Sequence, residues 1–110
     1  MKPFLTGSRA YGPIKPFSDI DIVVSKQTSK QLQTIFNILN IRWNKVNEDY
    51  IDSESIYVTI ENKLVNFIAV DKEYIPNWKH ATQKMKKIDP IKNRSERLAQ
   101  FQDFMQEYIE

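Results

Sequence analysis

The first apolar segments of the chain are short and are separated by turns. Residues 4–6 predict a strand that runs directly into a turn at residues 7–8. Residues 8–12 predict one turn of helix, which Gly12 and the proline after it would end. Residues 19–24 alternate polar and apolar side chains and then become wholly apolar, as a strand does when one end emerges at a surface site. The chain therefore begins with a strand, a short helix and a second strand.

A longer helix is predicted next, because apolar residues recur at helical spacing after position 28. Thr28 or Ser29 would cap this helix at its N-terminus. The residues expected to share its apolar face are Leu32, Ile35, Phe36 and Leu39. Residues 41–46 predict a third strand, and the polar residues 47–53 predict a loop.

Two strands joined by a tight turn follow. Residues 55–60 and 64–70 have strand character, and the three residues between them predict a hairpin. Asp71 would cap the next helix, in whose first turn Pro76 is tolerated. The apolar stripe of that helix is Tyr74, Trp78, Ala81 and Met85. The pair Asp89-Pro90 would end it. The shared face of a last helix is Leu98, Phe101, Met105 and Tyr108.

This order of elements predicts an α/β (α+β) fold. We expect a small mixed β-sheet of four or five strands with helices packed mainly on one face. Residues 1–110 contain no internal repeat and no linker, so we expect a single domain. A hydrophobic content of 41% is that of a folded globule rather than a disordered chain.

Charge and cysteine content narrow the function classes. The formal net charge of +2 is too small to require nucleic acid as a partner. The absence of cysteine excludes disulfides and thiolate metal sites. No apolar stretch approaches membrane-spanning length, and the first residues do not form a signal peptide. We therefore expect a cytoplasmic protein that has no membrane partner.

The strongest chemical signal lies in the first 24 residues. Both glycines of the chain, Gly7 and Gly12, stand in one segment, and Ser8 follows the first of them. Glycine followed by a small hydroxyl residue lets the backbone approach a phosphate closely. Asp19 and Asp21 then alternate on one strand, so both carboxylates leave the same face roughly 6–7 Å apart. Such carboxylates can bind Mg²⁺ or Mn²⁺ together with the phosphates of a nucleotide. The simpler interpretation is a glycine turn followed by a strand whose aspartates are merely solvated.

The segments Leu5-Thr6-Gly7-Ser8 and Ser18-Asp19-Ile20-Asp21-Ile22 resemble the signature of the DNA polymerase β-like nucleotidyltransferase superfamily. The resemblance covers residues 4–24 and is nearest to the small stand-alone (minimal) members, to which residues 9–12 are also similar. It implies transfer of a nucleoside monophosphate from a nucleoside triphosphate to an acceptor, with release of pyrophosphate. Asp19 and Asp21 would bind the metal, and Gly7 and Ser8 would hold the triphosphate.

Active members of that superfamily add a third carboxylate from a neighbouring strand, and the matching position here holds Asn66. An amide oxygen can ligate a cation, but it has no charge and cannot act as a general base. Asn66 could serve as a weaker ligand, or Glu61, Asp49 or Asp71 could replace the missing carboxylate. The domain could also bind a nucleotide without turning it over, and Asn66 could simply be a buried amide.

Several further residues have both a functional and a structural interpretation. Arg9 could bind a phosphate through its guanidinium group, or it could be a solvated arginine at a turn. Lys15 lies on the loop between the motifs and could reach a triphosphate. His80, the one histidine, is expected to be solvated. Basic residues between 79 and 97 could follow a nucleic acid, although a charged helical face is usually just solvated.

The leading hypothesis is a Mg²⁺-dependent nucleotidyltransferase whose site comprises Gly7, Ser8, Asp19, Asp21 and Asn66. Its acceptor could be a protein hydroxyl, a tRNA end or a small molecule. The second hypothesis is a degenerate nucleotidyltransferase fold that binds a partner protein in the manner of an antitoxin. The third is a small nucleic-acid-binding domain. A chain this short has no room for a second substrate-holding domain, so a partner chain or a homodimer is plausible.

Overall fold

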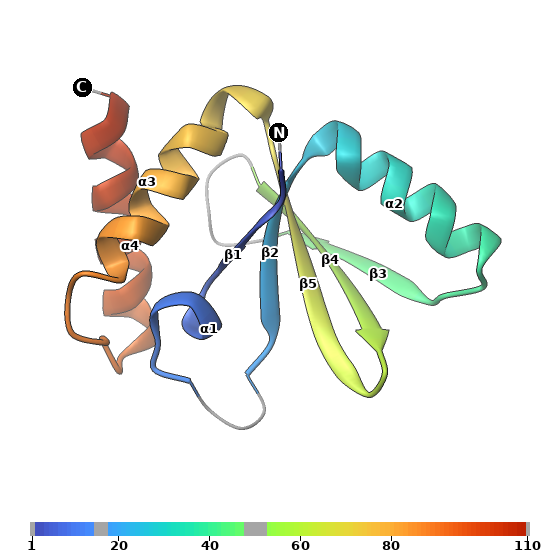
Figure 1. Cartoon of the computed structure of the whole chain (residues 1–110), viewed down its shortest axis with the longest axis horizontal. Helices are drawn as coiled ribbons and strands as arrows, with labels where there is room; N and C mark the ends of the chain where they lie inside the picture. The colour runs from blue at the N-terminus through green and yellow to red at the C-terminus, as the bar shows by residue number, and fades with distance from the viewer. Residues whose placement is uncertain (1, 15–17, 48–52, 110) are drawn as a thin grey trace.

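The centre of the protein is a five-stranded mixed sheet with the strand order β1-β2-β5-β4-β3 (Figure 1). The computed structural model describes residues 2–14, 18–47 and 53–109. The strands are β1 (Phe4–Thr6), β2 (Ile20–Ser25), β3 (Trp43–Asn47), β4 (Ser53–Ile60) and β5 (Lys63–Val70). β2 and β5 are parallel, whereas the other neighbouring pairs are antiparallel. The predicted α/β fold with a small mixed sheet is confirmed.

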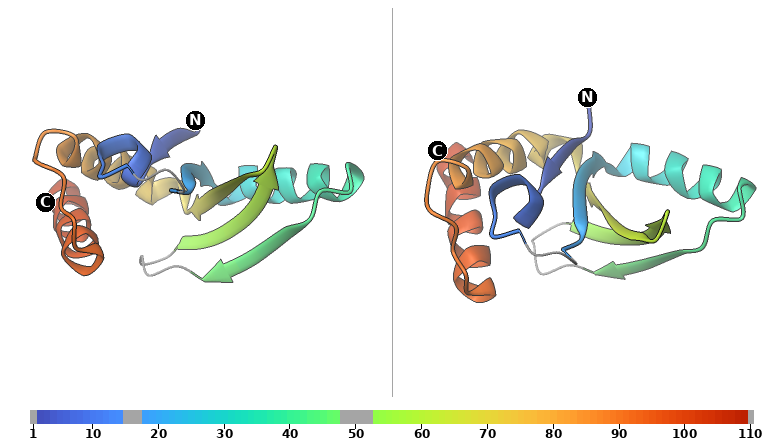
Figure 2. Two further views of the ribbon diagram at one scale, coloured as in Figure 1. Left: turned by 90° about the horizontal axis from the view of Figure 1, so that it is seen from below. Right: turned by 60° about the horizontal axis from the view of Figure 1, so that its bottom comes forward.

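Helices cover both faces of this sheet. They are α1 (Ser8–Tyr11), α2 (Lys26–Ile38), the 3₁₀ helix η1 (Lys72–Tyr74), α3 (Ile75–Met85) and α4 (Arg94–Ile109). α1, α3 and α4 pack together on one face, and α2 packs on the opposite face. Figures 1 and 2 show a twisted sheet with α3 and α4 at its β1 end and α2 at its β3 end. Most of the helical layer therefore lies on one face, as expected.

The larger hydrophobic core joins β2 and β5 to the layer of α1, α3 and α4. Its buried members are Tyr11, Val23, Ile68, Val70, Ile75, Trp78, Ala81, Met85, Phe101 and Phe104. Phe101 is central, because its ring centroid lies 5.1 Å from that of Trp78 and 6.1 Å from that of Tyr11. The aromatic contacts hold the one-turn helix α1 against α4 although the two are far apart in the sequence.

The smaller core lies under α2 on the other face. Phe36 packs with Ile56 and Val58, and its ring centroid lies 5.8 Å from that of Phe67. The expectation that Ile35 and Leu39 share this buried face is wrong, since they are 47% and 61% exposed. Of the expected apolar face, Leu32 and Phe36 pack in this core, and Phe36 is its buried member on α2.

The start of α2 also differs from the expected one. The helix begins at Lys26, and its N-cap is Ser25, whose Oγ accepts a hydrogen bond from the backbone N of Thr28 at 3.1 Å. The predicted caps Thr28 and Ser29 therefore lie inside the helix. The last residue of β2 thus ends the strand and caps the helix, so no loop separates the two elements.

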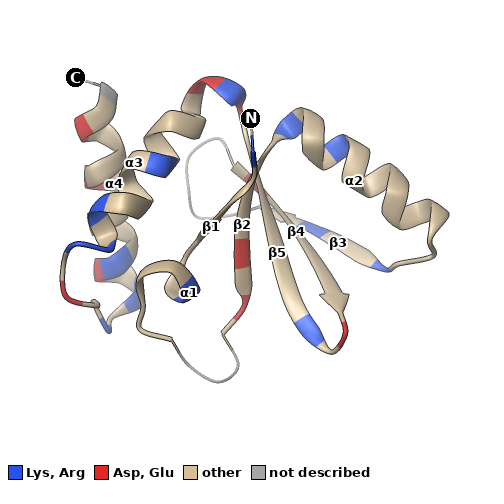
Figure 3. Cartoon of the chain, viewed as in Figure 1, with Lys and Arg blue, Asp and Glu red and all other residues tan. Residues whose placement is uncertain are grey.

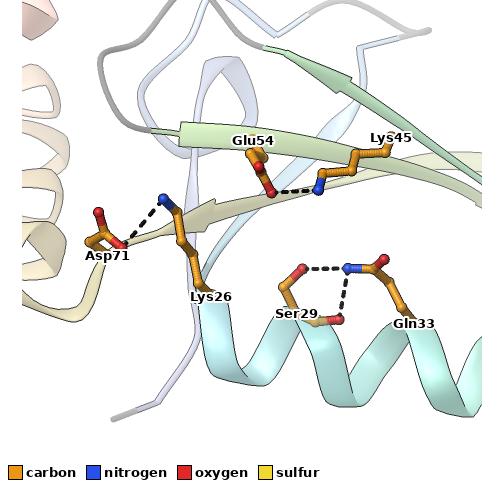
Figure 4. A network of polar contacts seen from close by, with 6 residues as sticks. All are labelled: Lys26, Ser29, Gln33, Lys45, Glu54 and Asp71. Carbon is orange, nitrogen blue, oxygen red and sulfur yellow. Dashed lines mark hydrogen bonds and ion pairs between the residues drawn. The ribbon is translucent and has the colours of Figure 1, made fainter.

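Polar contacts fasten α2 and β3 to the sheet (Figure 4). Lys26 pairs with Asp71 at 3.3 Å, and Lys45 pairs with Glu54 at 3.0 Å. Asp71 occupies the N-cap position of η1 as expected, but its side chain makes no capping hydrogen bond there. Both ion pairs are partly exposed, so each contributes only about 0–1 kcal/mol.

The predicted hairpin is present, with a shorter turn than expected. β4 and β5 are joined by Glu61 and Asn62, whose φ angles are +50° and +65°. Two successive residues with positive φ form the kind of turn that matches the twist of the flanking strands. β4 and β5 are therefore held in a long register that extends from Ser53 to Val70.

The two C-terminal helices pack against each other through a partly different set of apolar residues from the one predicted. Trp78, Ala81 and Met85 are buried as expected, whereas Tyr74 lies in η1 and is exposed. On α4, Phe104 is buried, whereas Tyr108 is 53% exposed. None of the helices in the described part of the chain is both long enough and apolar enough to span a membrane.

Candidate active site

A row of polar side chains crosses four strands on the face that carries α1, α3 and α4. Thr6 of β1 is opposite Asp21 of β2, Asp21 is beside Asn66 of β5, and Asn66 is opposite Tyr57 of β4. The next row on the same face, two residues further along each strand, includes the core residues Val23 and Ile68. The polar row therefore begins where the hydrophobic core ends.

A cavity of about 200 Å³ lies over this row. Its lining comprises Thr6, Gly7, Ser8, Tyr11, Asp19, Asp21, Tyr57, Asn66, Ile68, Arg94, Arg97 and Leu98. Five of the residues expected from the sequence, Gly7, Ser8, Asp19, Asp21 and Asn66, are among them. The structure thus brings residues from the first turn, the second strand and the fifth strand to one place.

Gly7 brings the backbone of the turn after β1 against an acidic side chain of the site. Its φ of +71° lies in the left-handed region that disfavours residues with a Cβ. A Cβ built at this position would overlap Oδ2 of Asp21. Only glycine therefore lets the turn after β1 lie directly against the carboxylate of β2.

Asn66 orients Asp21. Its Nδ2 donates a hydrogen bond to Oδ1 of Asp21 at 3.2 Å, and the side chain is only 3% exposed. The amide thus acts on the carboxylate from the neighbouring parallel strand. Because the amide carries no charge, it can hold Asp21 in place without repelling it.

Thr6 ties the floor of the cavity to the helical layer. Its hydroxyl lies 2.7 Å from that of Thr82 on α3, and the Thr82 hydroxyl donates to the backbone oxygen of Trp78 at 2.8 Å. Because the one hydroxyl hydrogen of Thr82 is used for Trp78, Thr6 is the donor to Thr82. Both threonines are buried, so this link fixes β1 and the following turn relative to α3.

Arg9 lies next to the site rather than in it. Its Nε donates to the backbone oxygen of Ser18 at 2.9 Å, and Arg9 is not among the residues that line the cavity. This contact fastens α1 to the residue that precedes Asp19. The structure therefore gives Arg9 a positioning contact and does not bring it to the cavity as a phosphate ligand.

Two of the three candidate replacements for a third carboxylate, Glu61 and Asp71, do not line the cavity. Glu61 lies in the turn between β4 and β5, and Asp71 pairs with Lys26 beyond the end of β5. Asp49 and Lys15 fall outside the described residues. No group of three or more His, Cys, Asp and Glu side chains is placed to hold a metal ion in the described ranges 2–14, 18–47 and 53–109.

His80 is also remote from the cavity, and it is not simply solvated as expected. Its Nε2 lies 3.4 Å from Oε2 of Glu107, and its ring is tilted against that of Tyr108 with the two centroids 5.5 Å apart. Glu107 and Tyr108 come from α4, so a search for carboxylates at helical spacing along α3 could not find this pair.

The sequence analysis missed three polar residues of the cavity: Tyr57, Arg94 and Arg97. Tyr57 is recognisable only once the hairpin register places it opposite Asn66. Arg94 and Arg97 belong to the basic stretch that we interpreted as a solvated face. Their spacing of three residues places both on the same side of α4, which is the signal that could have singled them out.

Replacing Gly7 by alanine tests the close contact between the backbone of Gly7 and the carboxylate of Asp21. Gly7→Ala and Gly12→Ala both force a residue with a Cβ into a backbone conformation that is almost exclusive to glycine, at a cost of about 1–3 kcal/mol each. At Gly12 the nearest atom to the new Cβ would be Cγ of Pro90 at 3.3 Å, whereas at Gly7 the new Cβ would overlap Asp21. We expect Gly7→Ala to lower the free energy of unfolding in urea clearly more than Gly12→Ala. Equal losses would contradict the packing of Gly7 against Asp21.

The sequence model of a family described as "Nucleotidyltransferase domain" matches residues 2–99 of the 110-residue chain. A search of curated proteins finds no match. The family match spans both glycines, both aspartates, Asn66 and the first turn of α4. The resemblance in residues 4–24 is thereby extended to most of the chain, which belongs to the nucleotidyltransferase domain family.

Proposed function

We propose that this protein transfers a nucleoside monophosphate from a nucleoside triphosphate to an acceptor hydroxyl and depends on a divalent cation. The observation that supports this most strongly is the shared cavity of a glycine turn and two carboxylates. Gly7 lies against Asp21, so a ligand bound at the turn is also next to the carboxylates. A solvated aspartate pair would not require such an approach.

The donor set fits a hard cation such as Mg²⁺ or Mn²⁺. Asp19 and Asp21 supply carboxylate oxygens, and Asn66 supports Asp21 through its amide. Mg²⁺ is usually bound by one or two carboxylates, with substrate phosphates and water as its other ligands. When bound, it would neutralise phosphate charge and so make the phosphorus easier to attack. Asp19 and Asp21 would be its protein ligands.

Gly7 and Ser8 are the proposed phosphate-binding residues. Because Gly7 has no side chain, the backbone of the turn lies in the cavity directly beside Asp21, and Ser8 adds a hydroxyl group there. The cavity of about 200 Å³ is smaller than the roughly 300–1,000 Å³ of typical ligand pockets. It therefore suits the phosphate chain of a nucleotide, with the base and sugar extending outside it.

The proposed reaction is an in-line displacement at the α-phosphorus. The acceptor oxygen forms a bond to this phosphorus, and the bond to the oxygen between the α- and β-phosphates breaks. That oxygen leaves with its electron pair as part of pyrophosphate, and the proton of the acceptor is released to water. The residues of the chain act mainly by positioning and by charge, because Asn66 cannot accept the proton.

Asn66 also supports a second candidate, which is nucleotide binding without turnover. The amide at this position removes a charge and a possible base from the site. In that case the domain would bind a nucleotide and act through a partner protein. The two candidates differ in whether a labelled phosphate moves to an acceptor.

Removing either carboxylate tests the proposed reaction. We expect Asp19→Asn and Asp21→Asn to abolish label transfer from α-labelled nucleoside triphosphates to acceptors in a cell extract. Both variants should also weaken Mn²⁺ binding, measured by electron paramagnetic resonance, at least about tenfold because a charged ligand is lost. The circular dichroism spectra should remain those of the native protein.

Asp103→Asn is the matched control, because Asp103 is exposed on α4 and does not line the cavity. This variant should transfer label and bind Mn²⁺ as the native protein does. Label transfer that survives both cavity substitutions would contradict the proposed reaction. Mn²⁺ binding with no transfer to any acceptor would favour binding without turnover.

Introducing a carboxylate at position 66 tests the proposed metal site through the melting temperature, without any measurement of activity. Asn66→Asp places a second negative charge beside Asp21, where the native amide lies 3.2 Å away. Without a divalent cation, the repulsion should lower the melting temperature. Mg²⁺ should then raise the melting temperature of Asn66→Asp more than that of the native protein, because a cation bound between the two charges relieves the repulsion.

The isosteric variant Asn66→Leu is the control for the loss of the amide. It should destabilise the protein, and Mg²⁺ should raise its melting temperature no more than that of the native protein, because it introduces no charge. An Asn66→Asp variant whose melting temperature responds to Mg²⁺ no more than the native protein does would contradict a cation site at Asp21.

A further inference from the structure

The cavity has a basic wall opposite its acidic one. Arg94 and Arg97 line it from the first turn of α4, whereas Asp19 and Asp21 line it from β2 and the residue before it. Figure 3 shows the same division of charge, with acidic positions at the start of β2 and basic ones between α3 and α4 and at the start of α4. The proposed reaction assigns no role to these two arginines.

The beginning of α4 fixes the direction of both arginines. Oδ1 of Asn93 accepts a hydrogen bond from the backbone N of Glu96 at 3.1 Å, so Asn93 caps the helix. The backbone N of Arg97 donates to the backbone oxygen of Asn93 at 2.9 Å. The cap sets where the helix starts, and residues 94 and 97 then fall on one side of it.

Arg97 is held in addition through its side chain. Its Nη1 donates to the backbone oxygens of Ile91 at 3.0 Å and Lys92 at 3.2 Å. The guanidinium group is therefore anchored to the loop before α4 while it lines the cavity. A guanidinium held in this way loses little further freedom when it binds an anion, and its planar fork matches two oxygens of a phosphate.

The charges that line the cavity and its small volume indicate which part of a nucleotide lies against Arg94 and Arg97. A divalent cation at Asp19 and Asp21 would offset these two carboxylates and would leave much of the charge of a triphosphate unmatched. The cavity is small, so a phosphate chain that touches the glycine turn also reaches the other walls. Arg94 and Arg97 supply the positive charge that such a chain lacks.

We infer that Arg94 and Arg97 bind the β- and γ-phosphates of the nucleotide and, after transfer, the pyrophosphate. This inference rests on the proposed function, because it assigns one end of its substrate. It makes the start of α4 a specificity determinant that selects triphosphates over monophosphates. It also assigns a role in the active site to an element that the motif of residues 4–24 does not include.

The experiment measures the binding of inorganic pyrophosphate, which avoids any assumption about the base. Isothermal titration in the presence of Mg²⁺ compares the native protein with Arg94→Gln and Arg97→Gln. We expect each substitution to weaken pyrophosphate binding roughly ten- to a hundredfold, because a charge-assisted hydrogen bond is lost. Mn²⁺ binding without pyrophosphate should not be weakened, because removing a positive charge does not disfavour a cation.

The double variant K86Q/K87Q is the matched control. Lys86 and Lys87 follow α3 in the same basic stretch, are exposed and do not line the cavity. The double variant removes two charges and each arginine variant removes one, so a diffuse field would be weakened at least as much in K86Q/K87Q as in either arginine variant. We expect pyrophosphate binding to K86Q/K87Q within about twofold of the native value, because distant exposed charges are screened by salt.

The outcomes separate this inference from the proposed function. Unchanged pyrophosphate binding in both arginine variants, or an equal loss in K86Q/K87Q, would overturn the inference even if the native protein transfers label. Arginine-dependent pyrophosphate binding without any label transfer would support the inference and contradict the proposed reaction. If Arg97→Gln unfolds because its contacts with the loop are lost, the test rests on Arg94→Gln. Weaker pyrophosphate binding to Arg94→Gln then supports the inference, and unchanged binding overturns it.

Discussion

The site depends on the close contact between the backbone of Gly7 and the carboxylate of Asp21. The register of β1 with β2 places Thr6 opposite Asp21, so the turn that follows Thr6 meets the acidic side chain. A positive φ and the absence of a Cβ at Gly7 make that contact possible. A side chain at this position would overlap Asp21, so the turn and the carboxylate could not lie in contact within one cavity.

The topology explains why the other polar residues gather at this contact. β2 and β5 are parallel neighbours, which places Asn66 beside Asp21, and the antiparallel hairpin then places Tyr57 beside Asn66. Helices α3 and α4 cover the apolar row next to these residues, and the start of α4 brings its arginines to the edge of the same cavity. The hydrophobic core thus determines both the floor of the site and its basic wall.

Sequence reasoning identified the features that depend on local chemistry and missed those that depend on long-range packing. The glycine turn, the aspartate pair and the hairpin are each contained in a few consecutive residues. Asn66 was found because it stands at the position where active members of the resembling superfamily have a third carboxylate. Arg94 and Arg97 were missed because the direction of a charged helix face depends on how α4 packs against α3. Ser25 was missed as the cap of α2 because it is also the last residue of a strand.

The central claim is that the carboxylates of Asp19 and Asp21 and the turn at Gly7 form one site for a cation and a phosphate chain. Crystals grown with Mn²⁺ and a nucleotide that has a methylene group between its α- and β-phosphates test this directly, through the anomalous scattering of manganese. We expect a manganese peak at the oxygens of Asp19 and Asp21, with phosphate density against Gly7 and Ser8. Manganese bound elsewhere, or phosphates away from the turn, would contradict the account.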